Sequence, residues 1–153
     1  MHVEKDYEEF LKLLNKNKVR YCIVGSYAIA FYARPRYTKD IDILIEPAGK
    51  NARKIVKTLK EFGFGSLDLS EDDFKKEGAI IQLGYEPVRI NLLTSLPGCS
   101  FGEAWKNKKI GDYGKEKVFF IGLKDLIKSK STSRRKQDEA DLEILLTMQE
   151  QKQ

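Results

Sequence analysis

Histidine and cysteine are scarce in this chain of 153 residues, and their scarcity limits its chemistry. The one histidine, His2, follows the N-terminal methionine, so Ser-His-Asp triads, Cys-His dyads and histidine-based zinc sites are excluded. The two cysteines do not make a disulfide framework, and Cys22 lies in an apolar segment where we expect a small core residue. Any catalysis must therefore use carboxylates, a metal ion, lysine, tyrosine or backbone groups.

Long apolar segments are missing as well. The longest uncharged run, residues 21–33, is too short to cross a bilayer, and residues 1–10 lack the apolar core of a signal peptide. Glycine and proline number 11 and 4, and charged residues make up 33% of the chain, which is typical of a globular protein rather than a disordered one. We therefore expect a cytoplasmic protein without a membrane segment.

The hydrophobic content of 41% is enough for one core in a chain of this length, so a single domain over residues 1–153 is expected. The net charge is +5 and the pI about 9.1. Such a balance suits an anionic partner, for example a nucleotide or a nucleic acid.

The spacing of apolar residues predicts strands that alternate with helices. We expect helices over residues 3–15, 26–33, 49–62, 101–109, 123–128 and 134–149. We expect strands over residues 21–24, 40–45, 79–83, 88–93 and 117–121, with a hairpin around residues 84–87. Alternating strands and helices plus a hairpin predict an α/β or α+β fold with a mixed sheet.

The most informative segment spans residues 21–46. An apolar run ends in Gly25-Ser26, a helix-like segment follows, and Asp40-Ile41-Asp42 opens a second apolar run. Alternate residues of a strand share a face, so the two aspartates lie side by side, where a divalent metal would relieve their repulsion. A Gly-Ser turn entering a helix presents backbone N–H groups to an anion such as phosphate. The alternatives are solvated charges on an exposed strand and a serine that caps the helix.

This arrangement resembles the nucleotidyltransferase fold of the DNA polymerase beta superfamily, in particular its small stand-alone bacterial and archaeal members of the minimal or antitoxin type. Gly25, Ser26, Asp40 and Asp42 fill the places of the Gly-Ser and Asp-x-Asp motifs. Residues 36–42, RYTKDID, look like the Arg-x-Thr-x-Asp-hydrophobic-Asp version of the second motif, and the likeness continues over residues 89–105 and 134–145. The resemblance implies a nucleotidyltransferase-like mixed sheet flanked by helices, with further helices at the C-terminus.

The resemblance also implies a reaction, in which a nucleoside monophosphate passes from an NTP to a hydroxyl of a protein, an RNA or a small molecule, with release of pyrophosphate. Asp40 and Asp42 would hold Mg²⁺ or Mn²⁺. The residues expected to contact nucleotide or phosphate are Gly25, Ser26, Arg36, Thr38 and Arg89. For Arg89, a salt bridge to one of the aspartates is an equal alternative. The nucleotide, the acceptor and the oligomeric state stay open.

Asn91 departs from the family pattern, which has a third carboxylate in a segment read here as Arg-Ile-Asn-Leu-Leu-Thr, residues 89–94. Asparagine can ligate a metal through its carbonyl oxygen, but it is no useful base. An acid from elsewhere is the first alternative, although Glu86 lies on the opposite strand face from Asn91 unless Pro87 reverses the alternation, and nothing in the sequence places the acidic stretch 68–73 at the site. The second is a catalytically degenerate nucleotide- or partner-binding member of a two-gene toxin–antitoxin or defence system. The third is a basic nucleic-acid-binding domain with incidental aspartates.

Basic residues form a run before and at the start of the last expected helix, where cations are unfavourable. The run allows two interpretations: it meets an anionic partner, or it pairs locally with Asp138 and Glu139. Arg34 and Lys39 likewise flank the aspartate pair and either meet phosphate or belong to a solvated loop. The members of the run are Lys128, Lys130, Arg134, Arg135 and Lys136.

Overall fold

The computed structural model of the chain describes residues 3–33, 38, 40–85, 88–133 and 135–151. Its centre is a mixed sheet in the order β3-β4-β2-β1-β6-β5. The strands are β1 (Tyr21–Val24), β2 (Asp40–Ile45), β3 (Ile80–Tyr85), β4 (Val88–Leu93), β5 (Lys109–Tyr113) and β6 (Glu116–Phe120). The helices are α1 (Lys5–Lys16), α2 (Gly25–Tyr32), α3 (Gly49–Phe62), α4 (Phe101–Lys106), α5 (Leu123–Thr132) and α6 (Lys136–Gln151).

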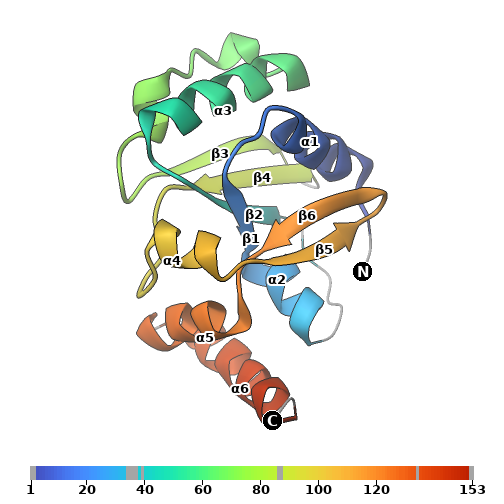
Figure 1. Cartoon of the computed structure of the whole chain (residues 1–153), viewed down its shortest axis with the longest axis vertical. Coiled ribbons are helices and arrows are strands. Elements are labelled where there is room, and N and C mark those ends of the chain that lie inside the picture. Colours follow the sequence, from blue (N-terminus) through green and yellow to red (C-terminus); the bar gives the residue numbers. More distant parts are fainter. Residues whose placement is uncertain (1–2, 34–37, 39, 86–87, 134, 152–153) are drawn as a thin grey trace.

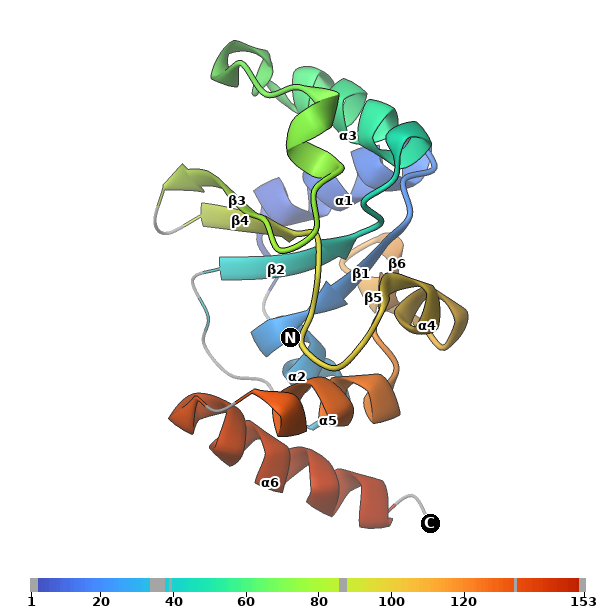
Figure 2. The same cartoon turned by 90° about the vertical axis from the view of Figure 1, so that its left-hand side faces the viewer.

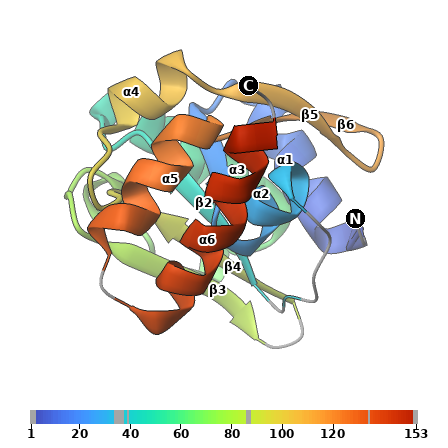
Figure 3. The same ribbon diagram turned by 90° about the horizontal axis from the view of Figure 1, so that it is seen from below.

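Helices lie on both faces of the sheet. Helices α1 and α3 cover one face, while α2, α5 and α6 lie on the other (Figures 1 and 2). Seen from below, α5 and α6 run across the molecule in front of α2 (Figure 3). The predicted α/β class with a mixed sheet, flanking helices and C-terminal helices is confirmed. None of the helices in the described ranges has the length and apolar character needed to cross a membrane.

Helix α3 shows how local sequence determines an element here. Ala52, Ile55 and Leu59 follow helical spacing and are fully or almost fully buried. Gly63 adopts φ 107° after the last turn, and its N–H and that of Phe64 donate to the carbonyl of Leu59. The predicted helix over 49–62 is therefore confirmed at both ends.

Strand β5 was not predicted from the sequence. It pairs antiparallel with β6 at the edge of the sheet, and of its residues only Tyr113 is buried. An edge strand with one buried side chain has too little apolar alternation to be recognised locally. Because β5 begins at Lys109, the helix expected over 101–109 ends earlier, at Lys106.

The pairing of three central strands decides where the polar side chains meet. β1 and β2 are antiparallel, and Val24, the last residue of β1, lies opposite Asp42. β2 and β4 are parallel, with Asp40 beside Arg89 and Asp42 beside Asn91. The start of α2 and the polar residues of two strands thus converge at one end of the sheet.

Candidate functional site

The side chains of Asp40 and Asp42 project from the face of β2 opposite to the buried Ile41 and Ile43. Arg89 reaches Asp40 across the parallel pair: its Nε lies 2.9 Å from Oδ1 and its Nη2 3.1 Å from Oδ2. Such a two-point contact fixes the planes of guanidinium and carboxylate relative to each other. Of the two roles open for Arg89, the structure shows the salt bridge.

Asn91 bridges the two carboxylates. Its Nδ2 donates to Asp42 Oδ1 at 2.9 Å and to Asp40 Oδ2 at 3.3 Å, and its Oδ1 accepts a hydrogen bond from Gln82 at 3.2 Å. Asn91 therefore meets the aspartates as a hydrogen-bond donor, whereas a third metal ligand would present its oxygen to them. It holds both carboxylates in place without adding charge.

Tyr7 of α1 fixes the backbone of β4 at Arg89. Its hydroxyl donates to the carbonyl of Arg89 at 2.9 Å and accepts from the N–H of the same residue at 3.0 Å. Burial raises the pKa of Tyr7 to about 12, so the hydroxyl keeps the proton that it donates. This contact, which the sequence did not indicate, anchors Arg89 from the far face of the sheet.

Gly25 allows the turn from β1 into α2 to pass directly over Asp42. It has φ 66°, and a Cβ placed on it would collide with Asp42 Oδ2. The N-cap of α2 is Val24, which has no side-chain oxygen to offer, so Ser26 is the second residue of the helix and does not occupy its cap position. The first N–H groups of an α-helix have no partner within the helix, and the start of α2 lies beside Asp42.

The Gly25→Ala variant is expected to lose about 1–2 kcal/mol of unfolding free energy, because alanine is strained at positive φ, and to displace the Asp42 carboxylate. Urea denaturation measures the first effect. The matched control is Gly63→Ala, since Gly63 also has positive φ but an added Cβ meets nothing within 4 Å. Both variants should be destabilised, and only Gly25→Ala should change ligand binding at the site; equal binding in the two would contradict the assigned contact.

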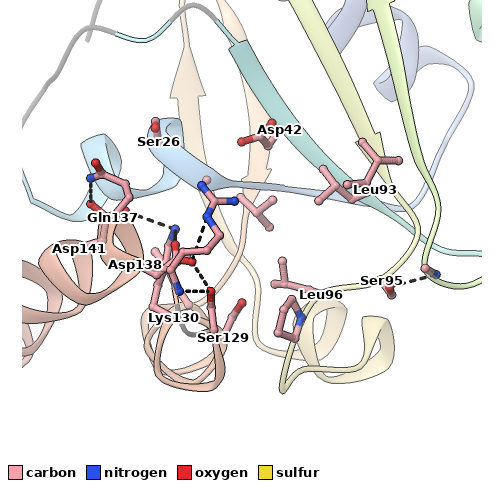
Figure 4. Close-up of a pocket in the computed structure, with 18 of the residues that line it drawn as sticks. Ser26, Asp42, Leu93, Ser95, Leu96, Ser129, Lys130, Gln137, Asp138 and Asp141 are labelled. Carbon is pink, nitrogen blue, oxygen red and sulfur yellow. Dashed lines mark hydrogen bonds and ion pairs between the residues drawn. The ribbon is translucent and has the colours of Figure 1, made fainter.

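A pocket of about 400 Å³ opens beside these residues, between the sheet and the C-terminal helices. Figure 4 shows Ser26 and Asp42 on one wall, Lys130 and Asp138 on the opposite wall, and Leu96 on a third side. Residues more than a hundred positions apart in the chain therefore enclose one space. The pocket is further lined by Gly25, Ile80, Leu93, Ser95, Pro97, Ser129, Ser133, Arg135, Gln137 and Asp141.

Lys130 joins α5 to α6 at the bottom of this pocket. Its ammonium lies 2.7 Å from Asp138 Oδ1 and 3.3 Å from Asp141 Oδ2. The side chains of the two acids are only 7% and 1% exposed. Burial alone would raise the pKa of Asp138, but hydrogen bonds from Lys130 and Ser133 outweigh it, so that the pKa lies below its ordinary value. For this part of the basic run, local pairing is what the structure shows.

Arg135 differs from Lys130 in its exposure to solvent. It lines the same pocket, yet its side chain is 79% exposed and lies 3.7 Å from Asp138. The pKa of Asp42 is raised, mainly by burial and also by Asp40, while Asn91, Lys130 and Arg135 lower it in part. The pocket thus holds a partly buried carboxylate, Asp42, and an exposed guanidinium, Arg135. From the sequence both cations were only members of a basic run, since nothing local showed that α5 and α6 return to the aspartates.

The other predicted residues have different surroundings. The hydroxyl of Thr38 donates to the backbone carbonyl of Asp40 at 3.0 Å, which makes it a support of the strand start. Arg36 lies outside the described residues, as do Arg34, Lys39 and Glu86. The acidic stretch 68–73 packs beside α3, where Glu71 pairs with Arg53, away from the pocket.

The donor chemistry of the aspartate pair fits a divalent cation, because Mg²⁺ takes carboxylate oxygens and keeps several of its waters. Within the described ranges no third carboxylate, histidine or cysteine joins the pair to form a larger cluster. Among the hydrogen bonds made by the described residues, the carboxylate of Asp40 accepts three and that of Asp42 accepts one, so Asp42 keeps more lone pairs for an ion. Asp42, with support from Asp40, is therefore the residue that would hold such an ion.

Solved structures with the same fold span nearly the whole chain. A lincosamide antibiotic adenylyltransferase, LnuA, bound to lincomycin, is similar with TM-score 0.58 and 15% identity over 95% of this chain and 97% of that one. An antigenic nucleotidyltransferase-like protein from Paracoccidioides brasiliensis has TM-score 0.58 and 12% identity, and the match covers 94% of this chain and 74% of that one. The antibiotic-resistance factor ANT(2'')-Ia has TM-score 0.58 and 11% identity, and the match covers 93% of this chain and 81% of that one. At these identities the likeness shows the fold.

No curated protein matches the sequence. A family model does: the family described as nucleotidyltransferase of unknown function (DUF6036) matches residues 2–150. This match covers nearly the whole chain, and it agrees with the resemblance found in the Gly-Ser and Asp-x-Asp motifs. The chain therefore belongs to this nucleotidyltransferase family.

Proposed function

We propose that the protein binds an NTP with a divalent cation at Asp42 and Asp40 and transfers its nucleoside monophosphate to a hydroxyl acceptor. The observation that carries this proposal is the convergence of three features on one pocket: the start of α2 at Gly25-Ser26, the Asp42 carboxylate and a facing guanidinium from Arg135. A volume of about 400 Å³ lies within the range of small-molecule sites.

Each residue has a distinct proposed role. The backbone N–H groups at Gly25 and Ser26 bind phosphate oxygens, favoured by the positive end of the α2 dipole. Asp42 and Asp40 ligate Mg²⁺ or Mn²⁺, which neutralises phosphate charge and polarises the α-phosphoryl group when bound. Arg135 swings from Asp138 to the outer phosphates, which its exposure allows at little cost.

The remaining wall of the pocket suits the uncharged part of a ligand. Ile80, Leu93, Leu96 and Pro97 provide apolar surface, and Ser95 adds a hydroxyl. LnuA is described as an adenylyltransferase, and ANT(2'')-Ia has been solved with adenylyl-2''-tobramycin. We therefore take ATP as the first nucleotide to test, and a small molecule with a free hydroxyl as the first class of acceptor.

The test is a calorimetric titration with ATP, GTP, CTP and UTP, each in Mg²⁺ and in EDTA. At least one nucleotide should bind at least ~10-fold more tightly with Mg²⁺, because the metal offsets the repulsion between phosphates and Asp42. Binding that is indifferent to Mg²⁺, or none to any nucleotide, would refute the proposed site. Steeply salt-dependent RNA or DNA binding without metal dependence would favour the basic nucleic-acid-binding alternative instead.

A second candidate function is favoured by Asn91 and Arg89. Arg89 offsets one carboxylate charge, Asn91 hydrogen-bonds both carboxylates, and Asn91 provides no base. A nucleotide-dependent partner-binding protein without transfer activity fits these features. The same samples separate the two functions, since transfer or hydrolysis releases pyrophosphate and simple binding does not.

A further inference from the structure

The Asp40 carboxylate has little remaining capacity for a metal. A carboxylate offers about four lone-pair positions. Arg89 Nε occupies one on Oδ1, while Arg89 Nη2 and Asn91 Nδ2 occupy two on Oδ2. Counting the contacts made by the described residues, one position on Oδ1 is left. An aspartate that bridges two cations would need more than this.

Charge leads to the same conclusion. The two carboxylates carry a total charge of −2. The guanidinium of Arg89, 2.9 Å from Asp40, contributes a charge of +1. Asn91, directly beside Asp42 in the parallel pair, adds hydrogen bonds and no charge. Among the described residues of β2 and β4 that contact the two aspartates, the balance is −1, and it lies on the Asp42 side. A pair of divalent ions close together needs more anionic ligands than this to offset their mutual repulsion.

Arg89 is also held where it is. The strand register places it beside Asp40, and Tyr7 binds both backbone groups of Arg89 from the other face. The guanidinium is half-buried, at 26% side-chain exposure. Arginine does not deprotonate in proteins, so this positive charge is permanent.

We propose that Arg89 takes the place of one of two divalent cations, so that the site binds a single divalent ion for each bound nucleotide. This inference rests on the proposed function and specifies the metal requirement of the same site. The ion is held by Asp42 with the last position of Asp40, and Arg89 with Asn91 supplies the fixed positive potential on the other side. In two-metal sites, the two ions stabilise the attacking and the leaving oxygen symmetrically. In this site, Arg89 and Asn91 would supply the positive potential of one of the two ions.

The experiment counts protein-bound Mn²⁺ by electron paramagnetic resonance after ultrafiltration, with the protein in excess over a non-hydrolysable α,β-methylene ATP. A titration with Mn²⁺ alone provides the baseline. The wild type should retain one Mn²⁺ per bound nucleotide. The double variant Arg89→Gln/Asn91→Asp, which frees Asp40 and adds a third carboxylate, should retain two.

Two further variants keep the result interpretable. Asn91→Asp alone leaves the Arg89 contact intact and should bind Mn²⁺ at least ~10-fold more tightly than the wild type, because a carboxylate replaces an amide. Arg20→Gln removes another strand-end arginine, paired with Glu46, and should leave the count at one. Circular dichroism confirms that each variant is folded.

The outcomes separate this inference from the proposed function. Two Mn²⁺ ions per nucleotide in the wild type, or one in the folded double variant, would overturn the role of Arg89 and leave nucleotide binding in place. Nucleotide bound without any Mn²⁺ would overturn both proposals. One ion in the wild type and two in the double variant would establish the guanidinium as the substitute for a cation.

Discussion

The Lys130→Met variant is expected to lose about 3–5 kcal/mol of unfolding free energy, the range for removing one partner of a buried ion pair. Lys130 is 15% exposed and lies between Asp138 and Asp141, which are almost fully buried on α6. Methionine fills a similar volume but leaves two carboxylates without their ammonium partner. Because these contacts join α5 to α6, the C-terminal helices should detach first.

The loss should depend on pH in a defined direction. The pKa of Asp138 is lowered in the folded protein, so its pairing stabilises the fold at pH values above the ordinary pKa, and this contribution is lost as the pH falls through the lowered value. The difference between wild type and Lys130→Met should therefore be largest near neutral pH and shrink below about pH 4.

Urea denaturation followed by circular dichroism, at pH 7 and pH 3, measures both effects. Lys117→Met is the matched control, because Lys117 pairs with Asp112 on the surface, where the side chains are 74% and 63% exposed. An exposed pair contributes roughly 0–1 kcal/mol. Equal losses in the two variants would show that the cluster at Lys130 does not hold α6 in place.

The Asp42→Asn variant is expected to weaken Mg-nucleotide binding by roughly 100-fold, since the proposed metal ligand loses its charge. The same variant should be at least as stable as the wild type at pH 7. Burial raises the pKa of Asp42, with a further rise from Asp40. The folded state therefore binds the proton more tightly than the unfolded state does, and stability falls as the pH rises through the window between the ordinary and the raised pKa.

Asparagine removes the free-energy cost of ionising Asp42 in the folded protein. The gain in stability should therefore appear at pH values above that window and vanish at lower pH. Thermal denaturation at pH 3 and pH 7 measures the gain, and calorimetry with Mg-nucleotide measures the loss of binding. Asp112→Asn, at an exposed position on β5, is the control with the same chemical change. Unchanged nucleotide affinity in Asp42→Asn would remove the central ligand from the proposed site. A variant that loses stability instead would mean that the carboxylate supports the fold.

The sequence by itself determined what depends on local periodicity. Alternation along residues 40–45 placed Asp40 and Asp42 on one face and the isoleucines on the other, and helical spacing fixed α3 to the residue. The Gly25-Ser26 motif marked the entry to α2. The sequence also placed Arg89 on the same face as Asn91 and near the aspartates, because residues two apart in a strand share a face.

The tertiary structure decided what those residues do. Strand pairing placed Arg89 in a salt bridge with Asp40 and made Asn91 a hydrogen-bond donor to both carboxylates, while a contact of Arg89 with phosphate stays a prediction. The return of α5 and α6 brought Lys130 and Arg135 to a pocket with Asp42, more than 80 residues earlier in the chain. Register and helix docking depend on how the whole core packs, whereas periodicity depends on neighbours in sequence. For that reason the helices and strands could be predicted from the sequence, whereas the contacts between the side chains that line the pocket could not.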